Sequence, residues 1–240
     1  ILFGERMIVS IHQPNYIPWL GYFHKIANSD VFVIFDDVQF PRGKDWIYRN
    51  KIKTENGAKW LSVPLKNKNN FLKINEIEIN NDIEWQKKHI NVLYSNYQKA
   101  EFFTTYFETL EKLLNKKWKF LMEMNLEIIH TIMKFLDIKT KIVFSSELNV
   151  KDTGTMKIIK IIEKLNGDKY FTSWGEGSRR YIEGFEEKFN DYGINIIRQE
   201  VMIPEYQQLF GNFLPELSIL DMLFNINAQK TQDFINNSKI

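Results

Sequence analysis

The sequence contains no cysteine, which excludes disulfide bonds, thiolate nucleophiles and cysteine-ligated zinc and fits a cytoplasmic protein. It also lacks a marked charge of either sign. Its 32 Lys and Arg residues against 30 Asp and Glu give a net charge of +2, too small a surplus to indicate nucleic-acid binding. No apolar run reaches the roughly 18 residues that a membrane-spanning helix requires, so we expect no such helix.

The N-terminus, residues 1–6, has neither the cationic start nor the apolar core of a signal peptide. Met7 opens the first apolar segment and is the natural initiator, so we interpret residues 1–6 as a remnant of cloning. A chain of 240 residues is long enough for one well-buried α/β domain that carries an insertion. We find no internal repeat and no low-complexity linker, and we therefore assign residues 7–240 to a single domain.

Apolar segments of strand character alternate with helical ones along most of the chain. The first strand ends at Ile11, a helix extends from about Pro18 to Ala27, and a second strand covers Val31 to Phe35. Further strands are predicted at 140–144, 170–173 and 194–198, and further helices at 156–165, 181–189 and 217–234. The pattern predicts an α/β fold with a doubly wound, mostly parallel, five-stranded Rossmann-like sheet.

The middle of the chain interrupts this alternation. Residues 41–52 resemble a loop rich in cations and rings, and residues 59–65 and 73–79 alternate apolar and polar side chains. The alternation predicts a β-hairpin with a polar tip at 67–70. Three helices with apolar stripes are predicted at 83–99, 102–115 and 118–136. We interpret residues 58–137 as a hairpin and helical insertion.

Polar residues at the predicted strand ends are the first candidates for a site, because ligands gather beyond the carboxyl ends of parallel strands. His12 and Gln13 follow the first strand and precede a helix N-terminus, which favours an anion. A histidine simply bonded to a neighbouring loop is the alternative. Asp36, Asp37 and Gln39 follow the second strand. Neighbouring side chains on a strand point to opposite faces, so only one of these carboxylates can face His12.

Two further segments combine chemistry-bearing residues. Trp46, Arg49 and Asn50 bring together a ring that can stack and a guanidinium that grips phosphate or carboxylate, although a surface turn pinned by a tryptophan fits equally. Ser173 and Gly175 follow a third strand, where glycine lets the backbone approach a ligand and where an ordinary strand–helix turn is the alternative. The glycine spacing there fits neither a Walker loop nor a dinucleotide fingerprint, and no histidine pair has metal-ligand spacing.

Five blocks of sequence carry a family resemblance. They are His12-Gln13-Pro14-x-Tyr16-x-Pro18-Trp19-Leu20-Gly21-Tyr22-Phe23-x-Lys25-Ile26, Asp37-Val38-Gln39-Phe40, Trp46-x-x-Arg49-Asn50-x-Ile52, Pro204-x-Tyr206-x-Gln208 and Phe213-x-Pro215-x-Leu217-Ser218-Ile219-x-Asp221. With these blocks the chain resembles the WbqC-like family, which is associated with bacterial O-antigen and other surface-polysaccharide gene clusters. Two positions depart from the family pattern: Ile203 stands where a histidine is expected, and Trp174 where a glycine is more usual.

The resemblance implies a role in surface-polysaccharide (O-antigen) biosynthesis, with transfer of an acyl or aminoacyl (glycyl-type) group to a nucleotide-linked amino sugar. We expect His12 to act as the general base and Asp37 to orient it or to hold the sugar. The expected partners are a sugar nucleotide and an acyl or aminoacyl donor, with nucleic acid only as a charged carrier; no cofactor, metal or oligomeric state is predicted. The expected substrate-binding residues are Gln13, Asn15, Tyr16, Trp19, Tyr22, Asp36, Gln39, Trp46, Arg49, Asn50, Ser173, Gly175, Tyr206 and Gln208.

Two other functions stay open at this point. One is a non-catalytic binder of a nucleotide sugar or glycan that partners a glycosyltransferase. The other is nucleotidyl transfer, because the opening strand, loop and helix also resemble nucleotidylyltransferase-like folds with an HxGH signature. The comparable positions here read Ile17-Pro18-Trp19-Leu20 and hold no histidine, which disfavours that chemistry.

Overall fold

The computed structural model describes residues 7–43, 45–66 and 71–237, so the interpretation of residues 1–6 and the predicted hairpin tip at 67–70 lie outside it. Five strands form one parallel sheet in the order β5-β2-β1-β6-β7. Their bounds are β1 Ile8–His12, β2 Val31–Ile34, β5 Lys141–Phe144, β6 Lys169–Thr172 and β7 Asn195–Arg198. The predicted α/β class and five-stranded parallel sheet are confirmed.

The strand order reverses at the centre of the sheet. From β1 the chain adds β2 and then β5 on one side, and it next crosses to the other side of β1 to add β6 and β7. Val9 pairs with Val31 of β2 and also with Tyr170 of β6, so β1 lies directly between the two halves. The carboxyl ends of β1 and β6 therefore flank the topological switch point, where open α/β sheets bind their ligands.

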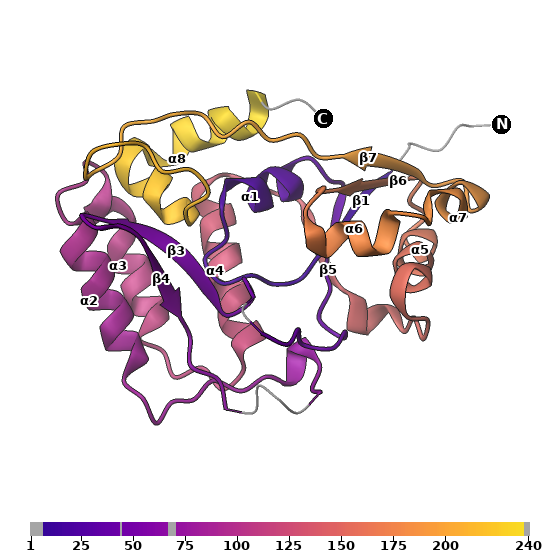
Figure 1. Cartoon of the computed structure of the whole chain (residues 1–240), viewed down its shortest axis with the longest axis horizontal. Helices are drawn as coiled ribbons and strands as arrows, with labels where there is room; N and C mark the ends of the chain where they lie inside the picture. Colours follow the sequence, from indigo (N-terminus) through magenta and orange to yellow (C-terminus); the bar gives the residue numbers. More distant parts are fainter. Residues whose placement is uncertain (1–6, 44, 67–70, 238–240) are drawn as a thin grey trace.

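Helices cover both faces of the sheet, and the alternation of side chains along β2 shows which helices lie where. Val31 and Val33 belong to one buried cluster with α5 (Gly154–Lys164), α6 (Glu176–Ile182) and α7 (Glu186–Asp191). Phe32 and Ile34 belong to a larger cluster with α1 (Leu20–Ala27), α4 (Leu121–Phe135) and α8 (Ile219–Asn237). Figure 1 shows α1 near the centre, α5, α6 and α7 on the right, and α8 on the left.

The three helices predicted in the insertion are present as α2 (Trp85–Tyr97), α3 (Phe103–Leu114) and α4. The rings of Phe103 and Phe107 stack at 4.3 Å on α3, and Phe103 also meets Phe224 of α8 edge-on. The helix predicted at 181–189 is instead divided into α6 and α7. Gly184 stands between them with φ at +78°, a left-handed conformation that ends one helix before the next begins.

The predicted hairpin of 59–65 with 73–79 is present only as an isolated antiparallel bridge between Leu65 and Ile79, and the regular hairpin lies elsewhere. The hairpin pairs β3 (Arg49–Thr54) with β4 (Gly57–Ser62), so part of the expected loop at 41–52 is a strand. Gly57, at φ +92°, closes its tight turn. In the second predicted strand, Ile74, Ile77 and Ile79 are all buried, but a 3-10 turn at Ile74–Glu76 presents the first two three positions apart. The buried Ile77 and Ile79 have the two-residue spacing of a strand, but the spacing of Ile74 and Ile77 is that of the 3-10 turn.

The start of α1 also differs from the prediction. Pro18 lies before the helix rather than in its first turn, because α1 begins at Leu20 with Trp19 as its N-cap. The Pro18 carbonyl is free to accept a hydrogen bond from the Ile219 amide at 2.9 Å, which ties this loop to α8. A Cβ on Gly21 would overlap the Trp19 ring, so glycine is required for the indole to fold back over α1.

Candidate functional site

Two buried asparagine side chains hold the loop between β1 and α1 by donating hydrogen bonds to its carbonyls. Asn50 Nδ2 donates to the Ile17 carbonyl at 2.6 Å and to the Tyr16 carbonyl at 3.3 Å. Asn125 Nδ2 donates to the Pro14 carbonyl at 2.8 Å. The Tyr16 hydroxyl is itself buried against His89 Nδ1 at 2.8 Å. Of the predicted ligand-binding residues, Tyr16 and Asn50 therefore build the loop that presents His12, and Asn15 is buried within it.

His12 is the last residue of β1, and as a whole residue it is partly exposed. Its Nδ1 lies 2.9 Å from the Gln13 carbonyl, which can only accept, so the proton is assigned to Nδ1 and the lone pair to Nε2. The Tyr22 ring packs edge-on against His12 at 4.9 Å, and its hydroxyl donates to the same carbonyl. Burial and the charge of Lys25 lower the pKa of His12 to about 3. His12 is thus a neutral imidazole at physiological pH, with Nε2 as an acceptor.

Lys25 is the neighbour that the sequence did not single out. It extends from α1 with its side chain buried, and burial lowers the pKa of its amine to about 7. Its Nζ donates to Ser173 Oγ at 3.3 Å, and Ser173 Oγ lies 3.0 Å from Ser178 Oγ in the first turns of α6. We call His12, Lys25, Ser173 and Ser178 the switch-point cluster, because they gather at the carboxyl ends of β1 and β6.

Asp36 and Asp37 are committed to a different network at the ends of β2 and β5. The buried Asp36 carboxylate accepts hydrogen bonds from the Ser146 amide at 3.0 Å and the Ser146 hydroxyl at 2.7 Å. Asp37 pairs with Lys157 at 2.6 Å and accepts the Ser145 hydroxyl. Partial burial acts to raise the pKa of Asp37, but the hydrogen bonds from Lys157 and Ser145 and the lysine charge outweigh it and hold that pKa below its ordinary value.

The expected orientation of His12 by Asp37 is not found among the described residues. The imidazole N–H is bonded to the Gln13 carbonyl, and both Asp37 oxygens are bonded to other side chains. Gln39, from the same predicted group, forms an isolated β-bridge with Lys73. Asp36 and Asp37 therefore link the end of β2 to β5 and α5. The switch-point cluster lies instead at the ends of the neighbouring strands β1 and β6.

Tyr206 and Gln208 take part in a second buried network. The Tyr206 and Tyr97 hydroxyls each donate to the Asp221 carboxylate at 2.7 Å, and burial raises the pKa of Asp221. Gln208 Oε1 accepts from Lys53 Nζ at 3.0 Å and from the Leu214 amide at 2.9 Å. These contacts fasten the irregular segment 199–218 to β3 and α8, so the last two sequence blocks have a clear structural role.

Aromatic and cationic side chains form a patch on the hairpin and the residues before it. The Trp46 and Trp60 rings lie 5.1 Å apart and are 38% and 40% exposed. The Arg49 guanidinium covers the Trp60 ring at 4.0 Å, and the Lys51 amine lies within 5.5 Å of both rings. We call Trp46, Arg49, Lys51 and Trp60 the hairpin patch. Such a surface suits a planar base together with phosphate or carboxylate.

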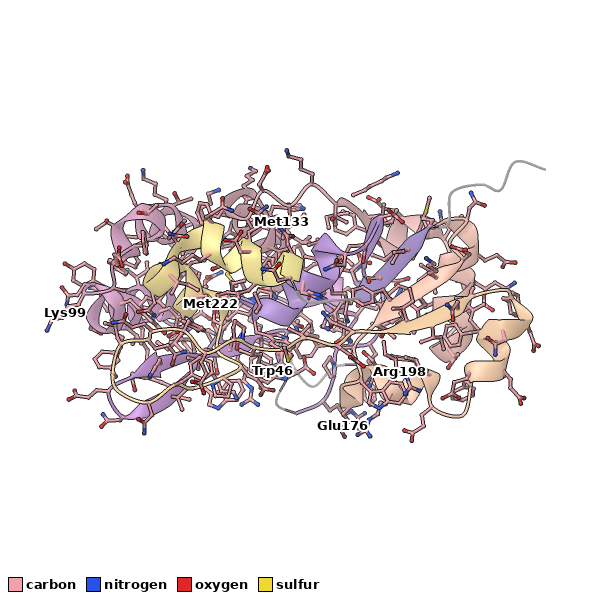
Figure 2. All side chains as sticks on the ribbon, turned by 90° about the horizontal axis from the view of Figure 1, so that it is seen from above. Trp46, Lys99, Met133, Glu176, Arg198 and Met222 are labelled. Carbon is pink, nitrogen blue, oxygen red and sulfur yellow. The ribbon has the colours of Figure 1, made fainter. Side chains whose placement is uncertain are left out.

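The hairpin patch and α6 share one side of the molecule. Figure 2 shows Trp46, Glu176 and Arg198 along the same side, and the charges of Arg180 and Arg49 both act on Asp45. On this same side, the Arg198 guanidinium stacks on the Trp174 ring at 3.5 Å, and Trp174 is 37% exposed. Trp174 occupies the position where the family pattern has glycine more often, and here it gives Arg198 a platform.

One hollow of the surface adjoins the hairpin patch, because Trp60 contributes to its lining, and a second lies apart along α2. Two open hollows of about 540 and 500 Å³ lie beside the hairpin turn (Thr54, Glu55, Asn56) and along α2 (Glu84, Lys87, Lys88). Within the described ranges, no three His, Asp or Glu side chains are grouped so that they could hold a metal ion. None of the helices in those ranges combines the length and apolar character needed to cross a bilayer.

The fold and the switch-point cluster define an α/β protein with its candidate site at the ends of β1 and β6. The profile of the WbqC-like protein family matches residues 13–233, and the chain belongs to that family. It is 34% identical over 224 residues to the uncharacterized protein Rv1507c of Mycobacterium tuberculosis, a match that covers 92% of this chain and 94% of that protein. No solved structure matches the chain significantly.

Proposed function

We propose that this protein transfers an acyl or aminoacyl group to the amine of a nucleotide-linked amino sugar in surface-polysaccharide biosynthesis. One observation carries the proposal: a neutral histidine and a buried amine with a pKa near neutrality meet at the switch point of a parallel sheet. Family membership supports the biosynthetic context. Acyl transfer to an amine needs an acceptor for the amine's proton and a site partly shielded from water, and this cluster offers both.

His12 and Lys25, the two basic residues of the cluster, have different roles in the proposed reaction. An imidazole whose pKa lies near 3 does not retain a proton at neutral pH, so His12 Nε2 serves to accept a hydrogen bond from the attacking amine and to hold it in line. Lys25, whose pKa is about 7, has the basicity to take up and release a proton under the same conditions. We therefore assign amine positioning to His12 and proton uptake to Lys25.

The hairpin patch is the proposed site for the nucleotide part of the acceptor. A base can stack on the partly exposed Trp46 and Trp60 rings, while Arg49, which covers one face of Trp60, and Lys51 carry the charge that a diphosphate requires.

The proposal is tested by incubating the purified protein with nucleotide-linked amino sugars and activated acyl or aminoacyl donors, with the amide product measured by mass spectrometry. We expect His12→Ala to lower kcat by about 100-fold or more, because a misplacement of the attacking amine by about 1 Å costs a factor of that size. Trp46→Ala should raise KM for the nucleotide sugar more than it lowers kcat. Lys87→Ala, on the exposed face of α2, is the matched control and should behave as wild type.

A non-catalytic nucleotide-sugar binder is the second candidate, because the hairpin patch alone would serve it. Thermal stabilisation by a nucleotide sugar that is lost in Trp46→Ala, with no amide product from any donor, would establish binding and refute catalysis. Unchanged turnover in His12→Ala would refute the role assigned to the switch-point cluster while leaving transfer itself intact.

A further inference from the structure

Three polar side chains of the switch-point cluster form a continuous chain of contacts. Lys25 Nζ lies 3.3 Å from Ser173 Oγ, and Ser173 Oγ lies 3.0 Å from Ser178 Oγ. They come from three different elements: α1, the end of β6 and the first turns of α6. An amine in hydrogen-bond reach of a serine hydroxyl, with a second hydroxyl behind it, is an arrangement that activates serine as a nucleophile.

The surroundings of Lys25 favour its neutral form. Its side chain is buried, and Ser173 Oγ is its single recorded hydrogen-bond partner among the described residues. An ammonium group has three donors, so a charged Lys25 would leave two of them without an acceptor in a site where that is costly. A neutral amine instead offers a lone pair, and the hydroxyl that can donate to it is that of Ser173.

The serine is accessible where the lysine is not. Ser173 and Ser178 are both partly exposed, and Trp174, Gly175, Glu176 and Gly177 between them are exposed. A Cβ added at Gly175 or Gly177 would meet nothing within 4 Å, so the backbone between the two serines borders open space. Ser173 thus lies next to an exposed segment, whereas Lys25 is 1% exposed.

We propose that Ser173 is a covalent nucleophile that carries the acyl group, with Lys25 as its general base and Ser178 as the residue that positions its hydroxyl. The proposal rests on the transfer function proposed above and extends it from direct attack to a two-step reaction. It takes Ser173 from the predicted group of substrate-binding residues and gives it a bond-forming role.

The two steps balance without any further reactant. Ser173 Oγ attacks the carbonyl carbon of an ester or thioester donor, and its proton passes to Lys25 Nζ. The carbon–leaving-group bond breaks, and Lys25 returns the proton to the departing alcohol or thiol. The acceptor amine, aligned by His12, then attacks the acyl-serine; the carbon–oxygen bond to Ser173 breaks, an amide forms, and the amine's proton restores the Ser173 hydroxyl through Lys25.

The first test uses p-nitrophenyl acetate, which needs no sugar acceptor. Wild-type protein should release nitrophenolate in a burst and gain one acetyl group, located on Ser173 by peptide mass spectrometry. Ser173→Ala should lose both signals, and Lys25→Met should slow the burst by about 100-fold or more. Ser95→Ala, an exposed serine on α2, is the matched control and should keep both signals. Acetylation of lysines with Ser173 unmodified would overturn the proposal.

A second test exploits the absence of cysteine, because Ser173→Cys creates the single thiol of the chain. Beside the Lys25 amine this thiol should ionise more readily than an exposed one, so its reaction with a disulfide reagent at pH 7 should exceed that of Ser95→Cys. Adding Lys25→Met should remove the difference. Equal reactivity of the two cysteines would refute the activation of residue 173 by Lys25. This comparison holds even if Ser173→Ala or Lys25→Met folds poorly.

The outcomes separate this inference from the transfer function on which it rests. An acetyl group on Ser173 without amide product from any nucleotide sugar would sustain the nucleophile and refute the proposed acceptor. Amide formation at an unchanged rate in Ser173→Ala would sustain transfer and refute the covalent step.

Discussion

Lys157→Met should unfold this protein more readily, and the loss should depend on pH in a defined direction. Lys157 and Asp37 are joined at 2.6 Å, and their side chains are only 8% and 15% exposed. Methionine keeps the length and apolar stem of lysine but leaves the Asp37 charge with Ser145 as its remaining side-chain partner. Removing one member of a buried pair costs about 3–5 kcal/mol, and the residual exposure favours a value of about 3 kcal/mol.

The pH dependence follows from the lowered pKa of Asp37. A carboxylate whose pKa is lower in the folded than in the unfolded chain adds stability above its unfolded pKa of about 4, and that stability is lost as the pH falls through the folded value. The difference between wild type and Lys157→Met should therefore be full at pH 7 and shrink below about pH 4.

Urea unfolding followed by tryptophan fluorescence measures the free energy of unfolding directly. At pH 7 the melting temperature of the variant should fall by roughly 6–12 °C for a chain of this size. The double variant Asp37→Asn with Lys157→Met should be more stable than the two single losses predict, because it leaves no unpaired charge. Strict additivity, or a loss that stays constant down to pH 3, would refute the reasoning.

Three further outcomes can be checked by thermal or urea unfolding. Lys25 has a folded pKa of about 7 against roughly 10.4 in an unfolded chain, so the unfolded form binds more protons between these values; wild-type stability should rise from pH 7 to pH 10, and Lys25→Met should abolish the rise. Asn50→Ala leaves the buried Ile17 carbonyl without its 2.6 Å donor and should cost about 1–3 kcal/mol, whereas a loss below 0.5 kcal/mol would contradict the bracing role of Asn50. Asn227 interrupts α8 at φ 70° and ψ 174° and caps the Lys230 amide, so Asn227→Ala should cost at least about 1 kcal/mol, and Asn227→Gly, which tolerates this conformation, should cost less.

The parallel sheet and its helices were predictable because their signals are local. Unbroken apolar runs such as Val31–Ile34 and the 3.6-residue stripe of α4 each carry their own periodicity. The hairpin was misplaced because Arg49 to Thr54 is rich in cations and reads as a loop. Its strand character comes from pairing with Gly57–Ser62 and from burial of Ile52 and the Lys53 stem against the rest of the chain, and no local pattern reports either.

The sequence predicted a site at the carboxyl edge of the sheet, and the structure groups the predicted residues differently from the expectation. Position after a strand singled out His12 and Ser173, but it could not show that their strands, β1 and β6, are neighbours. Asp37 follows β2 and is drawn to Lys157, which lies 120 positions later in the sequence. Lys25, in contrast, was not predicted as a site residue, because in the sequence it is one polar residue in an apolar helix. Its pKa is lowered by burial, which arises only when α1 packs against the sheet.

The placement of the insertion bears on how this molecule reaches its native state. Strands β2 and β5 are hydrogen-bonded neighbours, yet residues 35–140 separate them in the chain. Closing so long a loop is entropically slow, and pairing across it becomes favourable only once the hairpin and α2 to α4 have compacted the intervening chain. Until then the edge of β2 is exposed and able to pair with another molecule. Substitutions in the helical layer should therefore lower refolding yield and increase aggregation even where they do not touch the switch-point cluster.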